Sequence, residues 1–365
     1  MKHSSYKYIF FFNVVALVAS LITISVMNFN KDNSQGSIRA SITTPLICAE
    51  TLEAEFCKNA GAAVIIDVKS GAVLYEKNAQ TRMSMASTTK IMTALAVIEN
   101  SSFDKIITVS KNAAEVEGSS IYLYEGEKIS VGDLLYGLML ESGNDAAIAL
   151  AEGVFGSVEL CCDYMNKRCH EMGLVNTNFV NPHGLDDENH YTTAYELAVI
   201  TRHAMENEIF REIVSSANYV TTGEKTRYFS NHNRLLRNNS SFVGVKTGYT
   251  SKSGRCLVSA TNKDEKEYVA VTLNDSFDWE DHKNMHKYAH DNFCNYEIAK
   301  RDSFAVFSGF SQYRGFDNVY VTTTRDSEFW LNYKITTDGR TGRVEYSAST
   351  TSLGNFQIQN LNQEN

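Results

Sequence analysis

Three short motifs constrain the fold of this 365-residue chain, because they act together only if distant segments meet. Residues 87–90 (Ser-Thr-Thr-Lys) start a stretch with helical spacing of apolar residues, and residues 142–144 (Ser-Gly-Asn) lie between two helical stretches. Residues 246–248 (Lys-Thr-Gly) end a β-rich run. The order therefore predicts a site between helices and a sheet.

The first motif carries the elements of a nucleophile and its base. Residues i and i+3 share a helical face, so the Lys90 amine can lie beside the Ser87 hydroxyl. If burial lowers the pKa of Lys90, the amine can take the hydroxyl proton. Alone the motif is weak, because many helices begin with Ser, which suits capping, and carry Lys on a solvated face.

The other two motifs supply polar groups that could bind a substrate. Gly143 permits a tight turn from which Ser142 could relay a proton and Asn144 could bind an amide. Lys246 and Thr247 offer a positive charge and a hydroxyl to a carboxylate, and Gly248 lets a substrate backbone approach the strand. In isolation, an ordinary interhelical loop is the better explanation of residues 142–144, and a strand end that turns through Gly248 is the alternative for residues 246–248.

Changes in periodicity along the chain predict a mixed α+β fold. Hairpin-like runs at 62–68 and 72–75, and strand-like runs at 242–247, 255–261 and 268–273, predict a mostly antiparallel sheet flanked by helices. A helix is expected from about 279 to 293, and short alternating runs after 299 predict a small all-β domain.

The N-terminus predicts export or anchoring. Residues 9–27 form 19 uncharged residues after Lys2 and Lys7, which leaves a cleaved signal and an uncleaved membrane anchor both open. The lysines place everything after this segment outside the cytoplasm. The expected organisation is a signal or anchor at 1–28, a polar linker at 29–48, a catalytic domain at 49–298 and the β-rich domain at 299–365.

Charge and cysteine content exclude other classes of protein. A net charge of −9 argues against nucleic-acid binding. The seven cysteines include no Cys-x-x-Cys pair, so they indicate neither a metal site nor a redox motif. Cys161, Cys162 and Cys169 lie in a helix-like stretch and are expected to be small buried residues, with a bridge between Cys48 and Cys57 as an alternative.

Taken together, the three motifs resemble those of serine-type D-alanyl-D-alanine carboxypeptidases, which are low-molecular-mass penicillin-binding proteins. The likeness covers roughly residues 60–295, and the β-rich end resembles the family's C-terminal domain. It extends to the segments at 74–78, 85–93, 141–147, 181–185 and 244–250.

The resemblance implies a two-step acyl transfer on peptidoglycan stem peptides outside the bacterial cell membrane. Ser87 would attack the bond between two terminal D-alanines with Lys90 as base, and Ser142 would relay a proton. Backbone N–H groups of Ser87 and Tyr249 would form the oxyanion hole, and β-lactams would acylate the same serine. A metal or organic cofactor is not implied. The remaining site residues would bind substrate, namely Asn144, Lys246, Thr247 and Gly248.

Two rival functions remain open at this point. A serine β-lactamase shares the motifs, but class A enzymes need a glutamate for deacylation. The interval between Asn144 and Lys246 contains no Glu-x-x-Leu-Asn segment, and Glu196 begins a helix-like stretch. A non-catalytic wall-binding scaffold would usually have lost Ser87, Lys90 or Lys246.

Overall fold

A computed structural model describes residues 37–46, 56–237, 240–299, 313–315, 319–324, 329–337, 341–348 and 351–360. The chain divides into two compact units, with one boundary at Glu50/Thr51 and the other at Asn292/Phe293. The unit between these boundaries contains all three motifs. The proposed signal or anchor at 1–28 lies outside the described residues.

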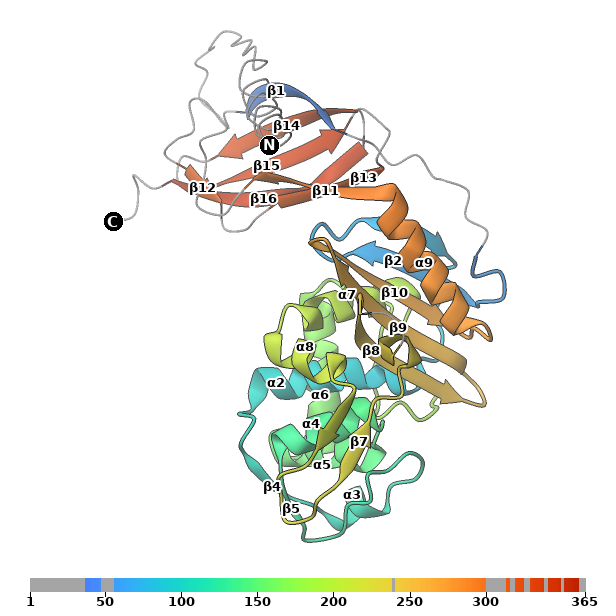
Figure 1. Ribbon diagram of the computed structural model, residues 1–365. Helices are drawn as coiled ribbons and strands as arrows, with labels where there is room; N and C mark the ends of the chain where they lie inside the picture. The colour runs from blue at the N-terminus through green and yellow to red at the C-terminus, as the bar shows by residue number, and fades with distance from the viewer. Residues whose placement is uncertain are drawn as a thin grey trace, which may run out of the picture. The chain divides into compact units, whose positions relative to one another are not determined.

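A five-stranded antiparallel sheet forms one layer of the central unit (Figure 1). Its spatial order is β3-β2-β10-β9-β8, and the predicted hairpin is the pair β2 and β3. The strands are β2 (Ala62–Asp67), β3 (Val73–Lys77), β8 (Phe242–Thr250), β9 (Gly254–Lys263) and β10 (Lys266–Leu273).

Helices cover both faces of this sheet, as alternation along the strands requires. On β9, Val258 and Ala260 pack into the main core. The alternate residues Ser259 and Thr261 point to the other face, where they contact α9 (Asp278–Asn292). The main-core side holds η1 (Ala86–Thr89), α2 (Lys90–Asn100), α4 (Val131–Leu140), α5 (Asn144–Phe155), α6 (Val158–Glu171), α7 (Ala194–Met205) and α8 (Glu208–Ser215).

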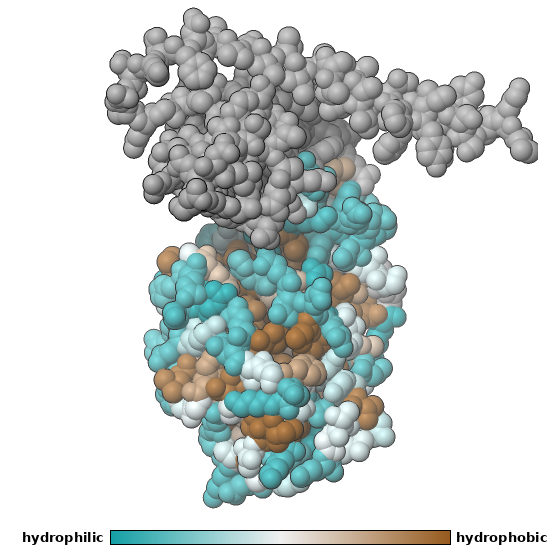
Figure 2. Space-filling model, turned by 90° about the vertical axis from the view of Figure 1, so that its left-hand side faces the viewer, coloured by the Kyte–Doolittle hydropathy of each residue, from teal (hydrophilic) through white to brown (hydrophobic). Residues whose placement is uncertain are grey.

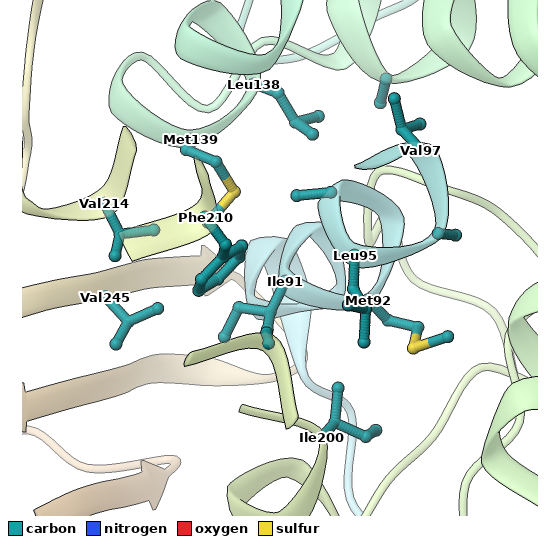
Figure 3. Close-up of a cluster of buried hydrophobic side chains, with 14 of the residues drawn as sticks. Ile91, Met92, Leu95, Val97, Leu138, Met139, Ile200, Phe210, Val214 and Val245 are labelled. Atoms are coloured by element: carbon teal, nitrogen blue, oxygen red, sulfur yellow. The ribbon is translucent and has the colours of Figure 1, made fainter. Parts of the chain in front are cut away.

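Helix α2 runs through the centre of this core. Its residues from Lys90 to Val97 are all buried, and Ile91 and Leu95 lie among side chains of α4, α7, α8 and β8 (Figure 3). Burial on every side explains why the helix is apolar almost throughout. It also fixes the position of Lys90 at its first residue.

Smaller elements complete the unit around these helices. Three of the larger helices begin at capping side chains, because Ser130, Ser157 and Thr193 accept N–H bonds at the starts of α4, α6 and α7. Helix α2 differs, since no side chain accepts a capping hydrogen bond at its start. The short elements are β4 (Ile106–Thr108), α3 (Lys111–Glu115), β5 (Lys128–Ser130), β6 (Asn218–Val220), β7 (Tyr228–Ser230) and η2 (Arg234–Arg237).

The second unit is built from strands. A five-stranded sheet has the order β1-β14-β15-β16-β12, and β11 pairs with β13 in a separate two-stranded sheet. The strands are β1 (Ser37–Leu46), β11 (Phe293–Ala299), β12 (Tyr313–Gly315), β13 (Val319–Thr324), β14 (Phe329–Thr337), β15 (Thr341–Ala348) and β16 (Thr351–Asn360). The predicted α+β fold with a β-rich C-terminal part is confirmed.

Two predicted boundaries differ from the structure. The prediction of a polar linker over 29–48 is wrong for Ser37–Leu46, because this segment forms β1 and pairs antiparallel with β14. The predicted end of the catalytic domain at 298 is too late, since Phe293–Ala299 forms β11 and pairs with β13 in the other unit.

The surface of the central unit is mixed. Figure 2 shows hydrophobic residues in small separate patches among hydrophilic ones on one face. The cysteines predicted to be structural are buried thiols on α6, which confirms that prediction for Cys161, Cys162 and Cys169. Cys57 is also a buried free thiol, and Cys48 lies outside the described residues.

Candidate active site

The backbone around Ser87 is tightly constrained. Ser87 lies in η1, and Ala86 before it adopts φ +48°, a left-handed conformation that is unusual for alanine. Two glycines approach this turn closely. A Cβ on Gly184 would lie 2.0 Å from Ala86 O, and one on Gly248 would lie 3.0 Å from Ser87 N. The packing therefore fixes the turn from both sides and leaves Ser87 half-buried.

Lys90 reaches Ser87 as the first motif predicts. Its Nζ lies 2.9 Å from Ser87 Oγ, 2.8 Å from Asn144 Oδ1 and 2.5 Å from the backbone oxygen of His183. The 3₁₀ turn at residues 86–89 brings positions i and i+3 nearly into register, which favours this contact. The first two predicted motifs are therefore in direct contact through Lys90.

The electrostatic surroundings favour a neutral amine at Lys90. Burial lowers the pKa of Lys90 well below its usual value, the nearby charge of Lys246 lowers it further, and Asp145 partly opposes both effects. Burial also lowers the pKa of Lys246 to about 7, although Glu141 opposes the change. Burial and the charge of Lys246 thus favour the neutral amine of Lys90 beside the Ser87 hydroxyl.

The Ser142-Gly143-Asn144 loop lies between α4 and α5, as predicted. The expected reason for its glycine is wrong, because Ser142 takes the left-handed conformation with φ +64°, whereas Gly143 has φ −57°. Gly143 is needed for space, since a Cβ there would lie 2.8 Å from Asp145 Oδ1. The buried Ser142 is thus held in a strained backbone at the loop.

Asn144 is oriented by both ends of its amide group. Oδ1 accepts a hydrogen bond from Lys90, and Nδ2 donates to the backbone oxygen of Glu117 at 2.7 Å. The neighbouring Asp145 carboxylate accepts from the backbone N–H groups of Ile121 and Leu123. These contacts bind the 117–123 loop to the start of α5, a role of Asp145 that sequence reasoning missed.

Residues of the third motif lie at the end of β8 that contacts η1. Lys246 is buried and its Nζ donates to the backbone oxygen of Thr247 at 3.1 Å. Thr247 and Gly248 are partly buried, and the side chain of Tyr249 is largely exposed. The close approach of Gly248 to the Ser87 N–H places the strand backbone next to the nucleophile.

Sequence reasoning assigned no role to His183. Its backbone carbonyl contacts Lys90, so no residue type at that position announces the contact. Burial lowers the pKa of the His183 ring to about 3, and the charge of Lys90 adds to this effect. The only sequence signal is the segment Asn181-Pro-His-Gly-Leu, whose Gly184 adopts φ +92°.

The described residues suggest neither a metal centre nor a spanning helix. Among them, no three His, Cys, Asp or Glu side chains form a group that could hold a metal ion. Within the same residues, no helix combines the length and apolar character needed to cross a membrane. The uncharged 9–27 segment lies outside the part of the chain that the structure describes.

Comparisons with known proteins identify the family of this chain. A model of the D-alanyl-D-alanine carboxypeptidase family matches residues 49–277. The chain belongs to this family. Curated relatives include D-alanyl-D-alanine carboxypeptidase DacF of Bacillus subtilis, 36% identical over 250 residues, covering 67% of this chain and 64% of DacF. DacC of Escherichia coli is 36% identical over 242 residues, covering 63% of this chain and 60% of DacC.

Solved structures give the same result for the fold. Penicillin-binding protein 5 of Haemophilus influenzae superposes with a TM-score of 0.73 at 25% identity, covering 85% of this chain and 98% of that one. The Streptomyces K15 DD-transpeptidase gives 0.62 at 32% identity, covering 66% and 99%. The matched regions span less than two thirds of the length of DacF and DacC.

Proposed function

We propose that this protein is a serine-type D-alanyl-D-alanine carboxypeptidase that removes the terminal D-alanine from peptidoglycan stem pentapeptides. One observation supports this most strongly, namely the 2.9 Å contact between Lys90 Nζ and Ser87 Oγ at an amine whose pKa is lowered. A neutral amine has two N–H groups and one lone pair. Asn144 Oδ1 and His183 O accept the two N–H groups, so the lone pair is directed at the Ser87 hydroxyl.

In the proposed acylation, Lys90 takes the Ser87 proton as Oγ attacks the carbonyl carbon between the two D-alanines. The C–N bond then breaks, and the leaving amine takes a proton relayed through Ser142. Water subsequently attacks the Ser87 ester, which releases the shortened peptide and regenerates the hydroxyl. Each proton removed from a nucleophile is thereby returned to a leaving group.

The remaining residues bind the substrate and its developing charge. Backbone N–H groups of Ser87 and Tyr249 would stabilise the oxyanion, which the approach of Gly248 to Ser87 N supports. Lys246 and Thr247 would hold the terminal carboxylate, and Gly248 would admit the peptide backbone. Asn144 would bind the peptide amide while it orients Lys90.

The setting of the reaction follows from the substrate. Stem peptides lie outside the bacterial cell membrane, which agrees with a chain whose first 28 residues are predicted to be a signal or an anchor. Attachment through residues 9–27 is part of this proposal. β-Lactams would be covalent inhibitors at Ser87 because they present a reactive amide to the same groups.

A class A type of β-lactamase activity has no support from Glu196. This carboxylate is buried and accepts the backbone N–H groups of Val175 and Asn176. It also accepts a bond from the Thr177 hydroxyl. These contacts make Glu196 a structural brace at the start of α7, so it is not available to activate a deacylating water.

Release of D-alanine tests the proposal. The full chain and its Ser87→Ala variant should be incubated with a peptide ending in D-alanyl-D-alanine, and free D-alanine should be quantified. We expect release by the wild type alone. A peptide ending in L-alanine should not be cleaved. Equal release by both proteins, or none by the wild type although it is folded, would refute the proposed function.

A further inference from the structure

The 181–185 segment delivers an acceptor to Lys90 from outside the three motifs. The backbone oxygen of His183 is 2.5 Å from Lys90 Nζ, on a segment distant in sequence from η1, α5 and β8. A carbonyl acceptor has no proton to exchange with the amine, so its contribution is to fix the direction of the N–H groups and thus of the lone pair.

Asn181 holds this carbonyl in place with both ends of its side chain. Its Oδ1 accepts from the backbone N–H of Gly184 at 2.7 Å and of His183 at 3.3 Å, and its Nδ2 donates to Leu185 O at 3.0 Å. The Gly184 N–H belongs to the same planar peptide unit as the His183 carbonyl, and the other two bonds hold the chain before and after that unit. Rotation of the carbonyl away from Lys90 would therefore break the bond from Gly184 N–H to Asn181.

The same segment is fastened to the turn that carries the nucleophile. Pro182 O accepts a hydrogen bond at 2.7 Å from Thr93, one turn along α2 from Lys90. The Thr89 hydroxyl contacts His190 Nε2 at 2.7 Å, and Val180 N donates to His190 Nδ1. Thus the segment is anchored before and after His183, and Asn181 controls the part between the anchors.

We propose that Asn181 is a positioning residue of the general base, which acts by holding the His183 carbonyl against Lys90. The inference deepens the proposed function and rests on it. Within the part of the chain that the structure describes, the Asn181 side chain bonds to His183, Gly184 and Leu185, so its effect on Lys90 passes through the peptide units of this segment.

Removing the Asn181 side chain should slow acylation in a pH-dependent way. In Asn181→Ala, the carbonyl is free to turn, and water can replace it beside Lys90. Hydration stabilises the charged amine, so the pKa of Lys90 rises towards its ordinary value. We expect benzylpenicillin acylation at neutral pH to fall about 10- to 100-fold. The rate should recover partly at alkaline pH.

A second variant guards against simple unfolding. Asn181→Asp keeps an acceptor for the His183 and Gly184 N–H groups and is nearly isosteric, but it loses the donor to Leu185 O. Its negative charge favours the charged form of Lys90, so the rising limb of the acylation profile should again move to higher pH.

Asn166→Ala is the matched control. Asn166 brackets Phe179 in the same way, since its Nδ2 donates to Phe179 O at 2.9 Å and its Oδ1 accepts from Phe179 N at 2.8 Å. This pair of hydrogen bonds lies just before the 181–185 segment and does not involve the peptide unit that contacts Lys90. We expect a loss of thermal stability without a shift of the pH profile.

The measurement is the acylation rate from intact-mass spectra across a pH series, with thermal unfolding recorded in parallel. A shift of the acylation pH profile to higher pH in both Asn181 variants, with no shift in Asn166→Ala, supports the inference. Unshifted profiles in the Asn181 variants, or an equal shift in all three, would refute it while leaving the proposed function intact. A folded wild type that is not acylated would refute both.

Discussion

Two buried polar clusters on opposite faces of the same sheet differ in how completely their titratable groups are satisfied. Under α9, His282, His286 and His290 alternate with hydroxyl groups, and Ser259 Oγ lies 2.6 Å from His282 and 2.7 Å from His286. Thr272 and Thr261 continue the chain at its two ends. They contact His282 at 3.1 Å, His286 at 2.9 Å and His290 at 2.9 Å.

At the active site, the same kind of burial leaves one group directed at a reactive hydroxyl. Lys90 is fully buried, yet one of its three partners is the half-buried Ser87. In the histidine ladder, formed by His282, His286 and His290, side-chain hydroxyls of the sheet contact both ring nitrogens of the first two residues and Nε2 of the third. The comparison teaches that burial alone does not indicate catalysis. A buried group whose pKa is shifted also needs a neighbouring group that can react.

The largest effect should come from Lys90. Replacing it in Lys90→Met keeps the volume of the buried side chain but removes the base. We expect acylation by benzylpenicillin to fall about 10²- to 10⁴-fold. Rates from intact-mass spectra, together with a thermal melt that shows a folded protein, check this. Acylation at the wild-type rate would remove Lys90 from the mechanism.

Lys246 should have the next largest effect. Lys246→Met removes a positive charge that we propose binds the substrate carboxylate. The same charge also lowers the pKa of Lys90. We expect kcat/KM for peptide hydrolysis to fall about 10- to 100-fold. Because the pKa of Lys90 should rise, the rising limb of the pH–rate profile should move to higher pH. The exposed Lys252 offers the control Lys252→Met, and equal losses in both variants would contradict the assignment.

The histidine ladder should affect stability without affecting chemistry. His286→Ala leaves a cavity and removes one partner from each of Ser259 and Thr261, so the free energy of unfolding should fall by about 2–4 kcal/mol. Denaturant unfolding measures this. His203→Ala, at a partly exposed histidine of α7, should cost much less. A loss of acylation in folded His286→Ala would show that the two clusters are coupled.

Mild acid should change the stability of the fold least. The direction of the change follows from the burial of the histidines. Burial lowers the pKa of His282 to about 3, while an unfolded histidine has a pKa of about 6.5. The unfolded chain therefore takes up protons first. The ladder's stabilisation is complete above about pH 6.5 and is lost as the pH falls towards about 3.

Thermal melts over this range test the sign. The decline should be shallower in His282→Phe, which has one fewer buried imidazole, than in the wild type. An identical dependence in the two proteins would mean that His282 does not contribute to the acid sensitivity of the fold.

Local patterns in the sequence were enough to predict the central sheet and its main helices. The helical stretches expected on both sides of residues 142–144 are α4 and α5, and the strands around Lys246 and Ser259 lie where alternation places them. The pairing of β1 with β14 was missed because the two segments are almost 300 residues apart in sequence, and polar residues 37–46 lack a strong periodic signal.

The site was predictable where side chains carry the chemistry. Ser87, Lys90 and Asn144 form one hydrogen-bonded group, whereas Thr247 and Tyr249 are placed only by the course of β8. The His183 carbonyl could not be predicted, because every residue type has one. Asn181 and Gly184 gave the only clue, since an Asn-Pro-His-Gly segment suggests a turn but not what the turn contacts.

The central claim is that Ser87 is the nucleophile activated by Lys90. Intact-mass analysis of the full chain after exposure to benzylpenicillin, beside the Ser87→Ala variant, tests it most directly. We predict one stable adduct with the mass of the drug on the wild type and none on the variant. An adduct on Ser87→Ala as well, or unchanged drug and unmodified wild-type protein, would contradict the account.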